Sequence, residues 1–174
     1  MKWVALLRGV NLGTRNKVPM AELRTKLESA GYEGVRTYIA SGNVLLDGPA
    51  SRAAVASDLE RIVANAFGVS TTTILRKPRE LAATVAAHPF DDDSETHVAF
   101  LAARPSTAAA TRLEAAGGGV DRAVLDGAEV YLRLTRGVHA SPLSIARLES
   151  LLGVSATLRN WRTVVALAQL AAEV

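Results

Sequence analysis

Hydrophobic positions in the first part of the chain change repeatedly between the spacing of strands and that of helices. An apolar run over residues 2–7 predicts a buried strand. Residues 20–30 carry apolar side chains at three- and four-residue spacing, which predicts a helix that begins at Pro19. Alternating residues over 35–40 and an apolar run over 44–46 predict two further strands, joined by a tight turn.

A second helix and a fourth strand complete this pattern. Ser51 is a suitable N-cap for a helix whose apolar stripe continues to Gly68. The β-branched run over residues 71–75 predicts a strand. The order strand, helix, strand, strand, helix, strand is that of a ferredoxin-like unit, in which two helices cover one face of a four-stranded antiparallel sheet.

The rest of the chain repeats this order of elements after an extra helix over residues 78–87 and an acidic linker over 88–95. The further strands are predicted over residues 97–102, 120–125, 129–134 and 154–158, and the further helices over residues 106–116, 141–152 and 160–172. Gly117-Gly118-Gly119 is predicted as a loop, and Asp126-Gly127 as a hairpin turn.

The element order therefore predicts an α+β protein made of two ferredoxin-like units. Residues 1–90 would form the first unit with its extra helix, and residues 91–174 a second unit of similar order. Such an order is consistent with duplication, although the linear sequence shows no residue-level repeat.

Composition narrows the class of protein. Of 174 residues, 49% are hydrophobic and 21% charged, which is enough apolar material for a core. The sequence has no cysteine, which excludes disulfides, thiolate metal sites and cysteine nucleophiles. The first apolar run is too short for a signal peptide or a membrane span, so we expect a cytoplasmic protein with no membrane partner.

Charge is unevenly distributed along the chain. The net charge is +3 overall, but it is +4 over residues 1–40, −4 over residues 41–132 and +3 over residues 133–174. Basic ends that meet in space would form one basic surface. Arginine outnumbers lysine sixteen to four, so base composition of the coding sequence offers a second explanation for the arginine excess.

The segment between the first strand and the first helix is the strongest candidate for chemistry. It holds two glycines and the polar residues Arg8, Asn11, Arg15, Asn16 and Lys17. Its spacing fits neither the nucleoside-triphosphate loop nor the dinucleotide-binding glycine pattern. The side chain of the valine before the proline cannot cap the helix, so the N–H groups of the first turn need another acceptor. One interpretation is that they bind an anion together with the cations of the loop. The other is that water or Asn16 forms hydrogen bonds with that turn.

Two other segments carry candidate ligand contacts. Ser41 and Asn43 flank a glycine in a turn that, alone, reads as an ordinary hairpin. Residues 159–162 place two arginines and a tryptophan at the start of the last helix. Such a group can stack on a base or clamp a phosphate, or the tryptophan can anchor the core while the arginines are solvated.

Together the three segments resemble the signatures of a bacterial family, domain of unknown function 1697. The matching residues are 6–13 with 16–20, then 38–44, then 157–164. Thr14 and Arg15 stand where a glycine and a lysine are common in the family. The resemblance implies a pair of α+β units and favours convergence of the three segments, and it implies no activity.

Catalytic and metal chemistry have little support. His88, His97 and the aspartates at 91–93 could ligate a divalent ion, but an acidic linker is usually a solvated loop, so no metal and no cofactor are expected. The candidate loops contain no carboxylate, which leaves them without a general base or a magnesium ligand.

These observations favour a binding module for a phosphate-bearing ligand or nucleic acid. The alternatives are an enzyme of unknown reaction acting on a small molecule, and a structural or self-associating protein. The predicted ligand contacts are the polar and aromatic residues of the three segments: Arg8, Asn11, Arg15, Asn16, Lys17, Ser41, Asn43, Arg159, Asn160, Trp161 and Arg162.

Overall fold

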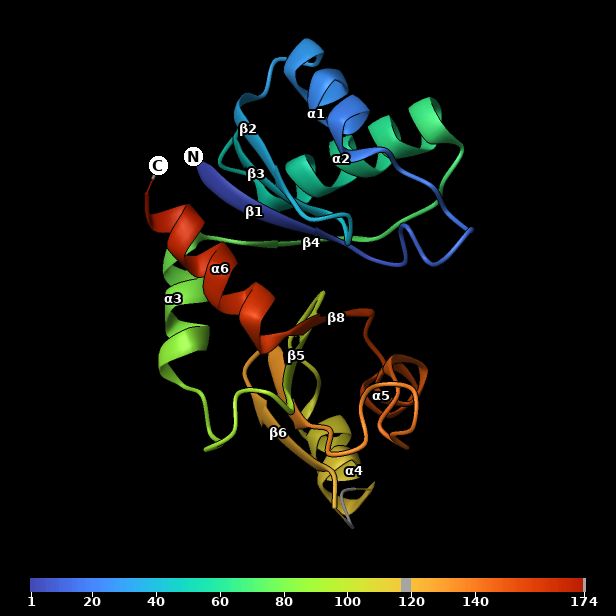
Figure 1. Cartoon of the computed structure of the whole chain (residues 1–174), viewed down its shortest axis with the longest axis vertical. Helices are drawn as coiled ribbons and strands as arrows, with labels where there is room; N and C mark the ends of the chain where they lie inside the picture. Colours follow the sequence, from blue (N-terminus) through green and yellow to red (C-terminus); the bar gives the residue numbers. More distant parts are fainter. Residues whose placement is uncertain (117–119, 174) are drawn as a thin grey trace. The chain divides into compact units, whose positions relative to one another are not determined.

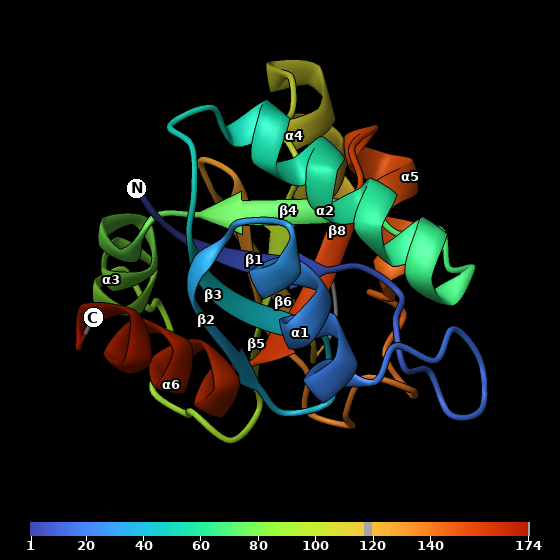
Figure 2. The ribbon, with the colours of Figure 1, turned by 90° about the horizontal axis from the view of Figure 1, so that it is seen from above.

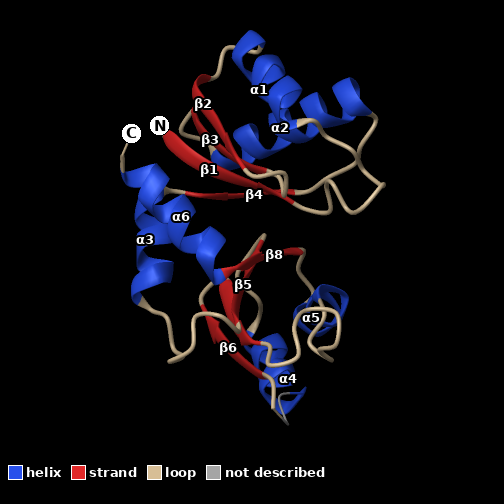
Figure 3. Cartoon of the chain, viewed as in Figure 1, coloured by secondary structure: helices blue, strands red, loops and turns tan. Residues whose placement is uncertain are grey.

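The structure, a computed structural model, describes residues 1–116 and 120–173. Within these ranges the chain forms six α-helices and two four-stranded antiparallel sheets (Figures 1 and 3). Its contacts separate two compact units, Met1–Leu81 with Leu167–Val174, and Ala82–Ala166. The predicted mixed α+β class is confirmed. The predicted glycine loop at 117–119 lies outside the described residues.

The first sheet is built around the N-terminal strand. Its strands are β1 (Lys2–Leu7), β2 (Glu33–Tyr38), β3 (Asn43–Asp47) and β4 (Thr73–Arg76). They lie in the order β2-β3-β1-β4, and each neighbouring pair is antiparallel. Every residue of β1 from Trp3 to Leu7 is buried, which confirms the predicted central strand.

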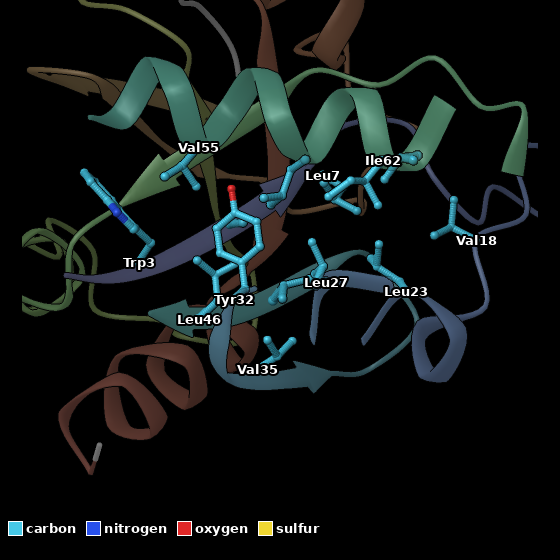
Figure 4. Close-up of a cluster of buried hydrophobic side chains, with 14 of the residues drawn as sticks. Trp3, Leu7, Val18, Leu23, Leu27, Tyr32, Val35, Leu46, Val55 and Ile62 are labelled. Atoms are coloured by element: carbon cyan, nitrogen blue, oxygen red, sulfur yellow. The ribbon is translucent and has the colours of Figure 1, made fainter. Parts of the chain in front are cut away.

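Helices α1 (Met20–Ser29) and α2 (Arg52–Phe67) cover one face of this sheet (Figure 2). Leu23 and Leu27 of α1 join Val55 and Ile62 of α2 and Leu7 of β1 in one buried cluster (Figure 4). Burying each such aliphatic side chain stabilises the fold by about 1.5–3 kcal/mol.

The ends of α2 are set by local signals. The amide of Ala54 donates to the Ser51 side chain at 3.2 Å, so Ser51 is the N-cap. Gly68 ends the helix in the left-handed region with φ 65°. Both features confirm the prediction.

The second sheet contains β5 (Thr96–Leu101), β6 (Arg122–Asp126), β7 (Glu129–Arg133) and β8 (Ala156–Asn160), in the order β6-β7-β5-β8. Helices α4 (Thr107–Ala116) and α5 (Ile145–Leu152) contribute buried side chains to a second core cluster with this sheet. Gly127, with φ 61°, forms the predicted turn between β6 and β7.

Several predicted boundaries in this unit are wrong, and the strand expected over residues 120–125 spans Arg122–Asp126. The helix expected from Ser141 begins at Ile145, because the Ser144 side chain accepts the amide of Arg147 and caps it there. Ser141 instead accepts the amide of Leu143 in the preceding turn. The last strand lies two residues later than expected, because residues 156–160 pair with β5.

Helices α3 (Pro78–Ala86) and α6 (Trp161–Ala172) lie outside the two strand–helix repeats. The division between the compact units falls inside both of them. Residues 82–90, expected in the first unit, belong by their contacts to the second, where the Tyr131 hydroxyl donates to the carbonyl of Thr84 at 2.8 Å. A boundary between independently folding domains at residue 90 stays a prediction. None of the described helices is long and apolar enough to cross a membrane.

Strand register relates the two sheets residue by residue. Val4 of β1 pairs with Arg76 of β4, and Val98 of β5 pairs with Arg159 of β8. Around these pairs β1 reads WVALL and β5 reads HVAFL. Each arginine is buried and donates Nη1 to the carbonyl of the leucine before it, at 3.0 Å and 2.8 Å. This correspondence was missed in the linear sequence because the rest of the two segments differs.

Candidate anion-binding loop

The loop after β1 folds back on itself in a narrow hairpin. The amide of Asn11 donates to the carbonyl of Asn16 at 2.8 Å. Leu12 and Arg15 exchange two backbone hydrogen bonds, at 3.1 Å and 2.9 Å. Asn11 and Asn16 both adopt φ 52°, a left-handed conformation that asparagine tolerates better than most residues. The backbone hydrogen bonds therefore fix the shape of residues 11–16.

The Asn11 side chain ties this hairpin to two other segments. Its Oδ1 accepts the amide of Val18 at 2.8 Å, and its Nδ2 donates to the carbonyls of Val18 and Ala40 at 2.9 Å and 2.7 Å. All three bonds are to backbone groups, which suits a structural role for the amide. Ligand contact by Asn11 stays a prediction.

Asn16 also stabilises the loop, but its side chain bonds to a residue before it and not to the helix after it. Its Nδ2 donates back to the carbonyl of Gly9 at 2.8 Å, so this group does not reach forward to the helix. Pro19 is the N-cap of α1, and in the described chain no side chain caps the first turn. The first-turn amides of α1 therefore lie beside the loop without a side-chain acceptor, as the sequence predicted.

The exposed cationic side chains of the loop form a basic surface. Arg15 and Lys17 are exposed, and neither forms an ion pair with any of the described residues. Neither residues 8–20 nor residues 34–46 contain an aspartate or glutamate. Arg8 is half-buried at the base of the loop, where its amide donates to the carbonyl of Thr72 at 2.9 Å.

The β2–β3 turn packs directly against the loop. Gly42 has φ 83°, and a Cβ atom there would lie 2.5 Å from Val10 Cγ2 and 2.9 Å from Leu7 Cβ. Its carbonyl also accepts the amide of Leu7 at 2.8 Å. The loop and the turn, the first two predicted segments, therefore come together, and only a glycine fits at their closest approach.

Asn43 holds the turn from inside. It is fully buried, and its Nδ2 donates to the carbonyl of Tyr38 at 3.0 Å and to Ser41 Oγ at 2.9 Å. These bonds satisfy a buried amide and indicate a structural role. Ligand contact by Ser41 and Asn43 stays a prediction.

The third predicted segment lies in the second unit and is largely committed to protein contacts. Arg159 is buried, and its Nη1 donates to Thr157 Oγ1 at 2.8 Å. Desolvation lowers the pKa of its guanidinium to about 10. Asn160 caps α6 by accepting the amide of Thr163 at 2.9 Å. Arg162 is exposed.

Trp161 anchors the beginning of α6. It is 6% exposed, and its ring stacks on the His88 ring with centroids 4.0 Å apart. His88 Nε2 lies 3.1 Å from Thr96 Oγ1. These contacts fit the interpretation that the tryptophan anchors the core. Ligand contact by this segment stays a prediction. No group of three His, Asp or Glu side chains within the described ranges is placed to hold a metal ion.

Two exposed apolar residues beside the loop were overlooked in the sequence. Leu12 in the loop and Ile39 in the turn are each 51% exposed. Ile39 also has φ 48°. The alternating pattern over residues 35–40 assigned Ile39 to a strand, and the loop residues were selected for polar chemistry alone. The adjoining turn residues at 41–43 were the only sequence signal that Ile39 leaves the strand.

Comparison with known structures and families agrees with this architecture. The chain is similar to the conserved bacterial protein SP0830 from Streptococcus pneumoniae, with a TM-score of 0.71, 21% sequence identity and 98% coverage of both chains. That likeness shows the fold alone. No curated protein matches the sequence. The sequence model of the family described as "Protein of unknown function (DUF1697)" matches residues 1–131. The chain therefore belongs to this family of unknown function.

Proposed function

We propose that this protein is a binding module for a phosphate-bearing ligand or nucleic acid, and that the loop over residues 11–17 makes the contact. The observation that carries the proposal is the exposure of Arg15 and Lys17 on a loop whose shape protein hydrogen bonds already fix. A ligand that binds a preformed loop does not have to order it.

The electrostatics of the segment support an anion as the ligand. Because neither cation has an ion-pair partner among the described residues, a bound phosphate would not have to displace a carboxylate. The start of α1 adds its first-turn amides and the positive end of its dipole, against which Glu22 places one carboxylate in the same turn. Screening by salt would weaken these exposed contacts strongly.

The remaining predicted contacts take second place in this proposal. Asn11, Asn16 and Asn43 would shape the site through their backbone hydrogen bonds instead of touching the ligand. Arg15 and Lys17 would make the direct contacts. The cysteine-free composition is the basis for proposing a reducing, cytoplasmic location.

We also propose that each unit is ferredoxin-like and that the two units arose by duplication. The order β2-β3-β1-β4 with antiparallel neighbours supports the first part, and β6-β7-β5-β8 has the same order. The shared register of Val4 with Arg76 and of Val98 with Arg159 supports the second.

Retention on a heparin column at low salt tests the binding function. Replacing Arg15 and Lys17 together by alanine should bring elution to a clearly lower salt concentration and leave thermal stability nearly unchanged. Lys26→Ala with Arg79→Ala is the matched control, since it removes one exposed lysine and one exposed arginine elsewhere. Equal elution of the two double variants would refute the proposal, because net charge alone would then explain retention.

A further inference from the structure

Two exposed aliphatic side chains lie at the same end of the first sheet as the basic loop. Leu12 and Ile39 are each 51% exposed. The hydrogen bond from Asn11 Nδ2 to the Ala40 carbonyl, at 2.7 Å, joins their immediate neighbours. This bond brings the loop and the turn together, and we refer to their exposed apolar and cationic residues as the loop–turn surface (Leu12, Arg15, Lys17 and Ile39).

Ile39 is costly to maintain in its position. Its φ of 48° is in the left-handed region, where a β-branched side chain is a true outlier. Asparagine or glycine would adopt this conformation with less strain, and either would expose less apolar surface. A side chain that is both strained and exposed does not stabilise the fold, so the strain indicates a role in recognition.

We propose that the loop–turn surface binds single-stranded nucleic acid. This inference rests on the proposed function and names the ligand class. Arg15 and Lys17 contact backbone phosphates, while Leu12 and Ile39 pack against the faces of unstacked bases. Aliphatic side chains are used against base faces by proteins that insert them between base steps, and single strands offer such faces without the cost of unstacking a duplex.

The composition of the surface favours this ligand over others with phosphate groups. A polyphosphate gives Leu12 and Ile39 nothing to contact, and a duplex exposes its base faces to them only at the cost of unstacking. A membrane surface offers both phosphate and apolar groups, but peripheral proteins commonly bind it with the continuous apolar face of a helix. Here the apolar side chains are two, on separate short turns.

Fluorescence anisotropy with the full chain tests the inference. The probes are a labelled oligothymidylate, a labelled DNA duplex of the same length and vesicles containing anionic lipid, all at one low salt concentration. Ile39→Asn should weaken oligothymidylate binding about fivefold to tenfold, as expected for losing one apolar base contact. It should leave duplex binding unchanged and raise the melting temperature, because asparagine relieves the strain. Arg15→Ala with Lys17→Ala should weaken both nucleic acids.

The outcomes separate this inference from the proposed function. Equal affinity for oligothymidylate and duplex, unaffected by Ile39→Asn, would overturn the inference and leave anion binding intact. A lower melting temperature for Ile39→Asn would show that Ile39 serves the fold, which also overturns it. Vesicle binding that depends on Ile39, without preference for oligothymidylate, would assign the surface to membranes. Failure of the wild-type protein to bind any phosphate-bearing probe would remove the proposed function itself.

Discussion

The side-chain amide of Asn11 donates a hydrogen bond to the carbonyl of Ala40, which is 29 residues away in the sequence. This contact joins the basic loop to the turn between β2 and β3. Since the same side chain also bonds both backbone groups of Val18, one residue connects the loop, the entry to α1 and the turn. The geometry of the proposed binding surface depends on it.

Asn11→Ala should therefore destabilise the protein by about 2–4 kcal/mol. Three hydrogen bonds are lost, and the backbone groups of Val18 and the carbonyl of Ala40 lose this partner. Equilibrium unfolding in urea measures the change. Asn11→Asp keeps the acceptor for the Val18 amide but removes the donor to the two carbonyls. It should destabilise the protein at least as much as alanine at neutral pH. A change below about 0.5 kcal/mol in both variants would show that the loop does not need this connection.

Gly42→Ala should disturb the contact between loop and turn. The new Cβ would meet Val10 Cγ2 at 2.5 Å, and the residue would keep a φ of 83°. Overpacking and backbone strain together should cost about 2–4 kcal/mol of unfolding free energy.

Gly68→Ala provides the control for that experiment. Gly68 also has a positive φ, of 65°, but an added Cβ would meet no heavy atom within 4 Å among the described residues. Its cost should be limited to strain, about 1 kcal/mol. Equal costs for the two alanine variants would contradict the close packing of Val10 against the turn.

Acid sensitivity is expected at Glu80 of α3. Burial alone would raise the pKa of this carboxyl, but hydrogen bonds from the Lys77 amide and the Arg52 guanidinium outweigh burial and lower the pKa below 4.5. Both carboxylate oxygens accept from Arg52 Nη2, at 2.7 Å and 2.8 Å. Because the folded-state pKa is the lower one, the carboxylate stabilises the fold above pH 4.5. That stability is lost as the pH falls through the folded-state pKa.

Thermal unfolding of Glu80→Gln between neutral pH and pH 3 measures this contribution. The variant should be less stable than wild type at neutral pH, and the difference should shrink on acidification. Glu114→Gln, which changes an exposed glutamate of α4, serves as the comparison. A stability difference for Glu80→Gln that stays constant with pH would contradict the assignment.

Local chemistry made much of the fold predictable. For α2, a serine cap, an apolar stripe and a terminal glycine all lie within the helix or at its ends, so the sequence contains the information directly. For α5, two serines three residues apart each accept an amide shortly after themselves. A rule based on capping cannot choose between them, and the predicted start was four residues too early.

Features that depend on contacts between distant backbone groups were harder to predict. The side chain of Asn11 donates to the backbone carbonyl of Ala40. Every residue has such a carbonyl, so the residue types in the turn do not indicate this bond. The correspondence between β1 and β5 emerged only when both strands were aligned by their pairing with β4 and β8. The strained backbone at Ile39 arises where β2 meets the turn, and alternation of side chains alone does not reveal it.

Anion binding by the loop is measured most directly by an NMR titration of the ¹⁵N-labelled full chain with inorganic tripolyphosphate at low ionic strength. We expect the largest saturable amide shifts at residues 12–17 and at the first turn of α1. Arg15→Ala with Lys17→Ala should abolish these shifts, while Lys26→Ala with Arg79→Ala should preserve them. Saturable shifts confined to other parts of the chain, or identical titrations for both double variants, would contradict anion binding by the loop.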